Sequence, residues 1–276
     1  MADENFEINL RPFPIHEVEH NSVCVFVGKR RSGKSFLLRN LMYNHRQIPV
    51  GTCISGTESA NPFFSYFLPK PFIHFRMNPA IIASAMKRQR LIKKRLIKEK
   101  NPEVRKQIDP RAFLILDDCL YDKTWTRDET IREIFMNGRH FDLMFMVTMQ
   151  YPLGIPPELR TNVDYTFIFR EPSISNRKRI YENYASCIPT FQLFNRIMDK
   201  CTENYECVVI KTLATTNKLQ DQVFWYKAPA VGDFRVGLDV FWNYKPESSD
   251  DDDEDFSSKE LISKRGGKDV KVKKRR

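Results

Sequence analysis

The sequence contains no apolar run that approaches the roughly 18 residues a helix needs to cross a bilayer. Its start, MADENFEINL, is acidic, whereas a secretory signal begins with basic residues. Patterns typical of zinc sites and disulfides are missing too, since the six cysteines include no CxxC pair and the five histidines no HExxH spacing. These absences predict a soluble, intracellular protein with no transmembrane segment, with reduced and mostly buried thiols, and with no structural zinc site.

The length and composition fit one large folded unit with appendages, because the chain has 276 residues of which 41% are hydrophobic. After Pro246 the sequence changes to ESSDDDDEDFSSKE and then KRGGKDVKVKKRR, which is too polar to bury a core. We therefore expect an N-terminal extension over residues 1–20, a folded domain over 21–245 and a disordered acidic and basic tail over 246–276.

The formal net charge is +10, and the positive excess lies in the predicted folded part. The tail holds nine acidic and nine basic side chains, whereas residues 1–245 hold 36 basic against 26 acidic ones. Within that body, residues 87–106 carry ten lysines and arginines against two glutamates. The folded body is therefore the basic part of the chain, and this one segment has a net charge of +8.

Strand-like apolar runs alternate with helix-like stretches, which is the pattern of an α/β fold with a mainly parallel sheet. We expect strands near 23–27, 50–55, 112–117, 142–149 and 164–169. We expect helices over 34–45, 79–100, 127–139, 173–184 and 189–200. We expect a C-terminal antiparallel strand pair from 206–212 and 222–228.

A glycine-rich loop follows the first expected strand, in the stretch VCVFVGKRRSGKSFLL. Residues 28–35 fit the pattern GxxxxGK[ST], with an apolar strand before it and a helix after it. The loop's N–H groups would bind phosphate oxygens, Lys34 would reach the β- and γ-phosphates, and Ser35 would ligate Mg²⁺. A basic surface turn with coincidental glycines is the alternative. The predicted nucleotide-binding residues are Gly28, Lys29, Arg30, Arg31, Ser32, Gly33, Lys34, Ser35 and Phe36.

Two carboxylates end the apolar run AFLILDDCL. Asp117 and Asp118 would stand at the sheet edge where open α/β sheets bind their ligands. Asp117 would hold Mg²⁺ directly or through water, and Asp118 would orient or deprotonate the attacking water. An Asx turn that only caps the strand is the alternative.

Polar residues also flank the next expected strand. Gln150 ends FDLMFMVTMQYP, where it would sense the γ-phosphate or help to place water. Arg139 lies upstream in IFMNGRHFD, at the end of a helix, where an isolated arginine is usually only a partner of the helix dipole.

The segments GKRRSGKS, LILDD, NGRH and VTMQYP, in this order and spacing, resemble the DNA-packaging ATPases of nucleocytoplasmic large DNA viruses, a branch of the FtsK/HerA group. The resemblance covers roughly residues 20–230. It implies an ASCE-type P-loop NTPase core with strand order 5-1-4-3-2 that uses ATP and Mg²⁺. It also implies a homo-oligomeric ring, a pentamer or hexamer, that moves double-stranded DNA into a capsid.

Carried over by position, the resemblance implies that Lys34 and Ser35 are the Walker A pair. It implies that Asp117 is the metal-binding acid and Gln150 the sensor. The predicted catalytic residues are Lys34, Asp118, Gln150 and Arg139, and the predicted metal ligands are Ser35 and Asp117.

Two of these positions carry an open question. Asp118 stands where the wider group often has Glu, so this shorter base would have to lie closer to the water. Arg139 matches the arginine that reaches a neighbour's nucleotide in FtsK/HerA rings. Arg30 or Arg31, acting in cis from the loop, is the alternative to Arg139.

The resemblance implies capsid or viral-membrane components as partners, and a place in the viral factory of the host cytoplasm or in the virion. The basic end KVKKRR suggests nuclear import or nucleic-acid binding, although such charge blocks are more often only solubilising.

The basic segment within 79–100 predicts an amphipathic helix. One face carries Ile82, Ala85, Ile92 and Leu96 and is interrupted by Gln89. The opposite face would neutralise DNA phosphates. A solvated face that contacts a neighbouring subunit is the alternative. The predicted DNA-binding residues are Lys93, Lys94, Arg95 and Lys98.

Three classes of function fit a phosphate loop: a DNA-translocating ATPase, a nucleoside or nucleotide kinase, and a nucleotide-dependent DNA-binding assembly factor that does not hydrolyse. A small kinase has no need for a basic body, a ring arginine and a Gln-tipped strand together. The assembly factor should lack a catalytic carboxylate, and Asp118 argues against it. The sequence therefore predicts an ATP-hydrolysing motor that translocates double-stranded DNA, packaging a viral genome.

Overall fold

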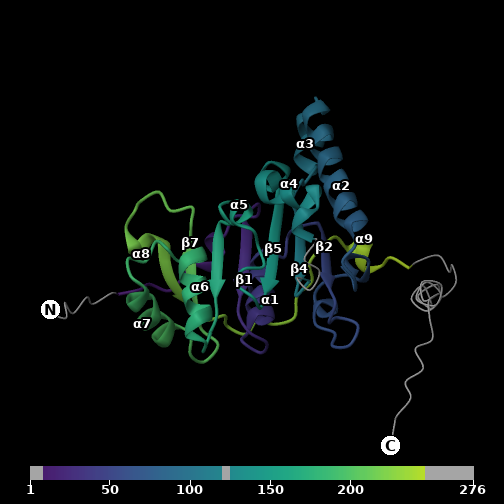
Figure 1. The fold of residues 1–276 in the computed structure, drawn as a ribbon. Helices are drawn as coiled ribbons and strands as arrows, with labels where there is room; N and C mark the ends of the chain where they lie inside the picture. Colours follow the sequence, from purple (N-terminus) through teal and green to yellow (C-terminus); the bar gives the residue numbers. More distant parts are fainter. Residues whose placement is uncertain (1–8, 120–124, 246–276) are drawn as a thin grey trace, which may run out of the picture. The chain divides into compact units, whose positions relative to one another are not determined.

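A single sheet joins strands that are far apart in the sequence (Figure 1). The computed structural model describes residues 9–119 and 125–245, so the predicted tail over 246–276 lies outside the described residues. Within them, eight strands form the sheet. They are β1 (Val23–Val27), β2 (Val50–Ser55), β3 (Ile73–His74), β4 (Ala112–Asp117), β5 (Leu143–Met149), β6 (Tyr165–Ile168), β7 (Cys207–Lys211) and β8 (Val223–Tyr226).

The strand order is β3-β2-β4-β5-β1-β6-β7-β8. Strands β1 to β6 pair in parallel, whereas β7 and β8 form the expected antiparallel extension. The full order differs from the predicted 5-1-4-3-2, because β3 adds an edge beyond β2 and β7 and β8 lengthen the other side. The five strands expected from the sequence lie within it in the succession β6-β1-β5-β4-β2. A two-residue strand such as β3 is too short to leave a periodic pattern in the sequence.

The central strands are apolar along their whole length because both faces of the sheet are covered. Alternate side chains enter two separate cores: Val25 lies in one and Phe26 in the other. The first core packs the sheet against α2, α4, α6 and α7, and the second packs it against α1. These helices are α1 (Lys34–Asn44), α2 (Pro79–Lys98), α4 (Glu129–Asn137), α6 (Ile174–Tyr184) and α7 (Phe191–Cys201).

Side-chain caps define where several helices begin. Asn78 accepts a hydrogen bond from the N–H of Ala80 at the start of α2, and Asp128 accepts one from Ile131 at the start of α4. Four shorter α-helices are α3 (Pro102–Gln107), α5 (Pro157–Arg160), α8 (Leu219–Gln222) and α9 (Asp239–Trp242), and short 3-10 helices lie between other elements. None of the helices in the described part of the chain is both long and apolar enough to cross a membrane.

Residues before β1 pack onto the body. The N–H of Phe13 donates to the carbonyl of Trp225 over 2.8 Å, and the side chains of Phe13, Ile15 and Val18 are buried. The elements described here belong to one compact unit that ends at Trp242. The boundaries predicted at residues 20 and 245 remain predictions.

Candidate nucleotide-binding and catalytic site

The loop between β1 and α1 has the backbone that its glycines predict. Gly33 has φ +100° at the N-cap of α1, a conformation that a side chain would strain. At Gly28 a Cβ atom would lie 2.7 Å from Cβ of Phe169 and 2.8 Å from Oγ of Ser32. The N–H of Gly28 donates to the carbonyl of Met149 over 3.0 Å, which ties the loop to the end of β5. The loop therefore turns sharply and starts a helix, as phosphate binding requires.

Lys34 is the first residue of α1, directly after the loop, and its side chain is buried. Its Nζ donates to the carbonyls of Gly28 over 2.7 Å and Lys29 over 2.8 Å. An ammonium group has three donors, so one remains for an anion. Burial lowers the pKa of Lys34, while Asp118 and Asp117 act against that shift and Arg30 adds to it. A phosphate at this position would restore the stability of the charged ammonium.

The other cations of the loop differ in their surroundings. Lys29 forms an ion pair with Glu171 at 3.1 Å, and this carboxylate is almost fully buried and also accepts the N–H of Ser173 over 2.8 Å. Lys29 thus fastens the loop to the segment after β6. Arg30 and Arg31 are exposed.

The register of the sheet places three oxygen-bearing side chains on one rung. Ser55 of β2 is paired with Asp117 of β4, and Asp117 is paired with Thr148 of β5. Thr148 donates its hydroxyl hydrogen to Oδ1 of Asp117 over 2.8 Å, and Ser55 donates to Oδ2 over 3.0 Å. Both oxygens of the carboxylate are thus held in place at the carboxyl end of the parallel strands.

Burial raises the pKa of Asp117, the hydroxyls of Thr148 and Ser55 lower it, and the nearby Asp118 raises it again. A carboxylate oxygen has more than one lone pair, so each oxygen of Asp117 can still accept a further partner. The donor set of Asp117 and the Ser35 hydroxyl consists of hard oxygen atoms, which suits Mg²⁺. In the described segments no group of three or more His, Cys, Asp or Glu side chains gathers for a metal.

Asp118 and Gln150 are in contact at the same edge. The Nε2 of Gln150 donates a hydrogen bond to Oδ2 of Asp118. The N–H of Asp118 donates to Oγ1 of Thr148 over 3.0 Å, and the residue has φ +54°. This backbone turn directs the side chain of Asp118 differently from that of Asp117. We call Ser55, Asp117, Asp118, Thr148 and Gln150 the carboxylate cluster.

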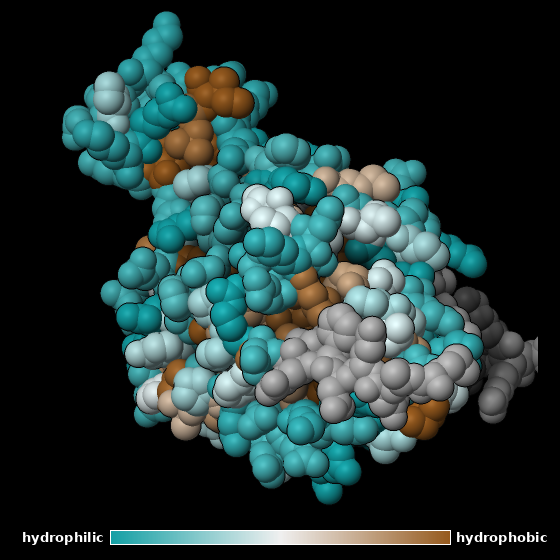
Figure 2. Space-filling model, turned by 90° about the vertical axis from the view of Figure 1, so that its left-hand side faces the viewer, coloured by the Kyte–Doolittle hydropathy of each residue, from teal (hydrophilic) through white to brown (hydrophobic). Residues whose placement is uncertain are grey.

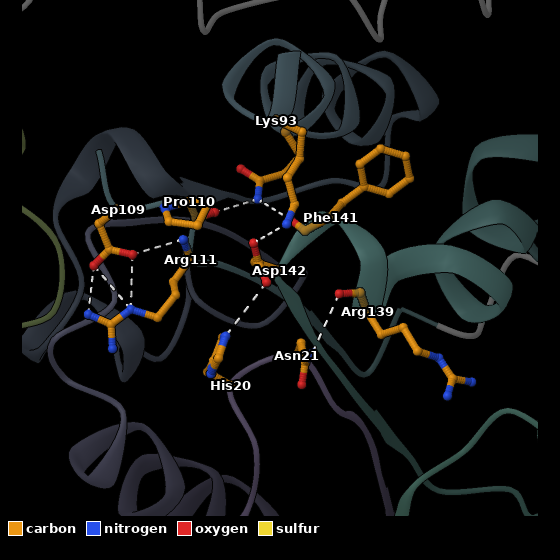
Figure 3. A network of polar contacts seen from close by, with 10 residues as sticks. His20, Asn21, Lys93, Asp109, Pro110, Arg111, Arg139, Phe141 and Asp142 are labelled. Carbon is orange, nitrogen blue, oxygen red and sulfur yellow. Dashed lines mark hydrogen bonds and ion pairs between the residues drawn. The ribbon is translucent and has the colours of Figure 1, made fainter. Parts of the chain in front are cut away.

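Arg139 lies at the amino ends of the parallel strands, opposite the carboxylate cluster. It belongs to a short 3-10 helix (Gly138–Phe141) that follows α4 and precedes β5, whereas Gln150 follows the end of β5. The seven residues of β5 separate the two by about 20 Å. The guanidinium of Arg139 points away from the polar network around it (Figure 3), and its carbonyl accepts from Nδ2 of Asn21 over 3.5 Å. Arg139 therefore does not reach the phosphate loop of its own chain.

The basic helix α2 is fastened to the edge that carries Arg139. Gln89 was expected to interrupt the apolar face, but its side chain is buried, and its Nε2 donates to the carbonyls of Pro110 over 2.8 Å and Phe141 over 2.6 Å. These residues directly precede the segments that lead into β4 and β5. Lys93 forms an ion pair with Asp142, which also lies 3.7 Å from Nε2 of His20 (Figure 3).

The outer part of α2 and α3 form an arm, residues 90–107. The arm extends beyond the amino ends of β4 and β5, on the side away from their arrowheads (Figure 1). Lys94, Arg95 and Lys98 are exposed on it. Apolar side chains also gather on the arm (Figure 2), where Leu91 is 57% exposed and Ile97 82% exposed. The arm therefore presents both charge and apolar surface.

Four of the six cysteines are buried, as predicted, and all six are drawn as free thiols. Cys119 lies beside the carboxylate cluster and donates from Sγ to the carbonyls of Ile54 over 3.2 Å and Asp117 over 3.3 Å. Burial, with Asp117 and Asp118 nearby, raises the pKa of this thiol to about 12. Cys119 is thus an inert thiol at neutral pH.

Sequence reasoning missed Thr148, Ser55 and Glu171. The first two carried a faint signal, because each is a hydroxyl residue near the end of an otherwise apolar strand. Glu171 carried none, because its partner Lys29 is far away in the sequence.

The chain is similar to proteins of large DNA viruses. It is 39% identical over 223 residues to uncharacterized protein L437 of Acanthamoeba polyphaga mimivirus, an alignment that covers 80% of this chain and 78% of the relative. It is 39% identical over 244 residues to uncharacterized protein 088R of Invertebrate iridescent virus 3, covering 85% and 89%. No family model matches the chain.

Solved structures share the fold at low sequence identity. The genome packaging NTPase B204 of Sulfolobus turreted icosahedral virus 2, in complex with AMP, superposes with a TM-score of 0.51 at 13% identity, over 77% of this chain and 100% of that one. The pCW3 conjugation coupling protein TcpA, with ATPγS, gives 0.53 at 13% identity, over 76% and 60%. The chain therefore shares its fold with these two proteins.

Proposed function

This chain belongs to the family of large-DNA-virus proteins that includes L437 and 088R, and we propose that it is an ATP-hydrolysing motor that translocates double-stranded DNA. In this proposal the DNA is the viral genome and its destination is the capsid. The names of the fold neighbours, a genome packaging NTPase and a conjugation coupling protein, support this reading.

The observation that carries the proposal is the position of the carboxylate cluster relative to the phosphate loop. Both lie at the carboxyl ends of the parallel strands, and β5 stands between β1 and β4. Asp117 and Asp118 are close enough to shift the pKa of Lys34. In this proposal one site combines the N–H groups of the loop, which would bind phosphate, with a buried cation and two carboxylates. These are the groups that hydrolysis of a nucleoside triphosphate needs.

The residues divide the chemistry between them. The free donor of Lys34 binds the β- and γ-phosphate oxygens and stabilises their charge. Gln150 and Asp118 hold the attacking water, since Oδ1 of Asp118 and the side-chain carbonyl of Gln150 remain able to accept its hydrogens. Asp118 takes up the proton as the water attacks, which is general-base catalysis.

Ser35 and Asp117 would hold Mg²⁺, with Thr148 and Ser55 fixing the orientation of the carboxylate. A bound Mg²⁺ would neutralise charge on the β- and γ-phosphates. The two hydroxyls keep Asp117 in position whether it contacts the ion directly or through water.

The motor would act as a homo-oligomeric ring. Arg139 of one subunit would complete the site of its neighbour. Within a single chain it lies at the amino ends of the parallel strands, whereas the site lies at their carboxyl ends. The arm would contact DNA through Lys94, Arg95 and Lys98, since the ammonium of Lys93 is already paired.

The test is the rate of ATP hydrolysis with and without double-stranded DNA, measured together with the mass of the protein in solution. The proposal expects an assembling ATPase that DNA stimulates. A monomer that transfers phosphate to nucleosides would identify a kinase instead. Tight ATP binding without turnover would identify an assembly factor.

A further inference from the structure

A hollow of about 690 Å³ adjoins the phosphate loop on the side away from the carboxylate cluster. Its walls come from three separate parts of the chain, which are residues 31–37, the turn at Asn204 and Tyr205, and Lys227 with Ala228. The antiparallel pairing explains why they meet, because β7 begins and β8 ends at the edge where β1 and β6 end.

The ring of Tyr205 lies against the loop. A Cβ built on Gly33 would be 3.5 Å from Cδ1 of Tyr205, so the aromatic side chain stands one van der Waals contact from the start of α1. It is nevertheless 70% exposed. The ring therefore presents a free face beside the place where phosphates would bind.

The backbone that holds this ring is strained. Asn204 has φ +48° and Tyr205 φ +66°, and the N–H of Glu206 donates to the carbonyl of Glu203 over 2.8 Å. Such a turn, with positive φ at both central residues, favours Gly, Asn or Asp, and a bulky aromatic residue is a rare occupant. Backbone strain lowers the stability of the fold, and a side chain that buries little surface does not offset that cost. Such strain is concentrated at functional sites.

We propose that Tyr205 is the platform on which the base of the bound nucleotide stacks. This inference rests on the proposed function, because it takes the phosphates to lie in the loop. With the γ-phosphate facing Asp118, on the β4 side of β1, the nucleoside must extend to the other side of β1, where Tyr205 stands. The hollow is large enough for a nucleoside.

A second hollow of about 650 Å³ offers a competing position for the base. It is lined by Phe36 and Arg39 of α1, by Phe63 and Tyr66, and by residues 233–235, and it shares only Phe36 with the first hollow. Tyr66 is 73% exposed, nearly the same as Tyr205. Tyr66 is therefore a matched control for an exposed aromatic residue near α1.

The experiment is calorimetric titration of the full chain with ATP and with inorganic tripolyphosphate, which lacks the base. Tyr205→Ala should weaken ATP binding about tenfold, which lies within the range found for a stacked base, and leave tripolyphosphate binding unchanged. Tyr205→Phe should bind both like the wild type, and so should Tyr66→Ala. A thermal melt of each variant checks that it folds.

Three results would overturn the inference: unchanged ATP affinity in Tyr205→Ala, an equal loss for ATP and tripolyphosphate in that variant, or the tenfold loss appearing in Tyr66→Ala instead. Lys34→Ala separates this inference from the proposed function, because it should weaken both ligands. If Lys34→Ala binds both normally, the phosphate site itself is wrong.

Discussion

Thr148 donates a hydrogen bond to Oδ1 of Asp117 over 2.8 Å while it accepts one from the N–H of Asp118 over 3.0 Å. One hydroxyl thus positions both carboxylates that the proposed reaction needs. Thr148→Val should lower Mg²⁺ affinity or turnover by about 10- to 100-fold, as is usual when a partner of a metal ligand is lost. Thr148→Ser, which keeps the hydroxyl, is the control in a magnesium titration of ATPase rate. Wild-type kinetics in Thr148→Val would show that the hydrogen bond from Thr148 to Asp117 has no part in Mg²⁺ binding or turnover.

Lys34 and Asp118 should separate binding from chemistry. Lys34→Ala removes the buried cation at the loop and should lose both nucleotide binding and turnover. Asp118→Asn keeps an oxygen that can accept from Gln150, so it should bind ATP normally. It should lose turnover by about 10²- to 10⁴-fold, because an amide cannot take up the proton. Calorimetry and steady-state ATPase assays measure the two quantities, and normal hydrolysis by Asp118→Asn would exclude it as the base.

Arg139 should act only between subunits. An arginine finger is worth about 10³-fold or more in rate, so Arg139→Ala should abolish most turnover of the assembled protein. Mixing Arg139→Ala with Asp118→Asn subunits should restore part of the activity, since some interfaces then join an intact arginine to an intact base. Full turnover by assembled Arg139→Ala would point to Arg30 or Arg31, whose alanine variants belong in the same assay.

The exposed and the paired cations of α2 should behave differently. Replacing Lys94, Arg95 and Lys98 with Gln should weaken DNA binding for all sequences and flatten the salt dependence by about 0.9 log unit per lost phosphate contact. Lys93→Gln is the matched control, because it removes an ammonium that is paired with Asp142. It should leave the salt slope unchanged. Fluorescence anisotropy at several salt concentrations distinguishes them, and an unchanged slope in the triple variant would make this helix face merely solvated.

His45 should make the fold sensitive to acid. Burial lowers its pKa from 6.5 to about 4, and His20 and Arg111 add to the shift. Between these two pH values His45 binds a proton in the unfolded chain but not in the folded chain. The contribution of neutral His45 to the free energy of unfolding is therefore complete above about pH 6.5 and is lost as the pH falls toward 4.

The loss attributable to His45 should be on the order of 1–3 kcal/mol. Urea unfolding at a series of pH values should therefore show a smaller loss in His45→Gln than in the wild type. His16→Gln, which changes an exposed imidazole, should keep the wild-type dependence. Equal pH dependence in wild type and His45→Gln would refute the assignment.

The sequence predicted the elements whose signals are local. Strands β1, β4 and β5 are uninterrupted apolar runs, and the phosphate loop is a contiguous motif whose glycines have the expected backbone roles at Gly28 and Gly33. The same apolar runs also predicted at which end of each strand the candidate site residues lie.

The features that escaped prediction depend on partners far away in the sequence. Ser55 and Thr148 join Asp117 only through the register of three strands, and Gln89 looks like a flaw in an apolar face until the carbonyls of Pro110 and Phe141 are seen beside it. The turn at Tyr205 runs against local preference, because a bulky aromatic residue does not favour the positive φ that it has there.

The attachment of α2 connects the arm to the same two strands that lead to the carboxylate cluster. Gln89 bonds the residues just before β4 and β5, and the far ends of these two strands carry Asp117 and Gln150. A strand that is nearly extended and hydrogen-bonded on both sides can hardly change its length, so it behaves as a stiff rod. In the proposed motor, a displacement of the arm would therefore be passed along β4 and β5 to Asp117 and Gln150.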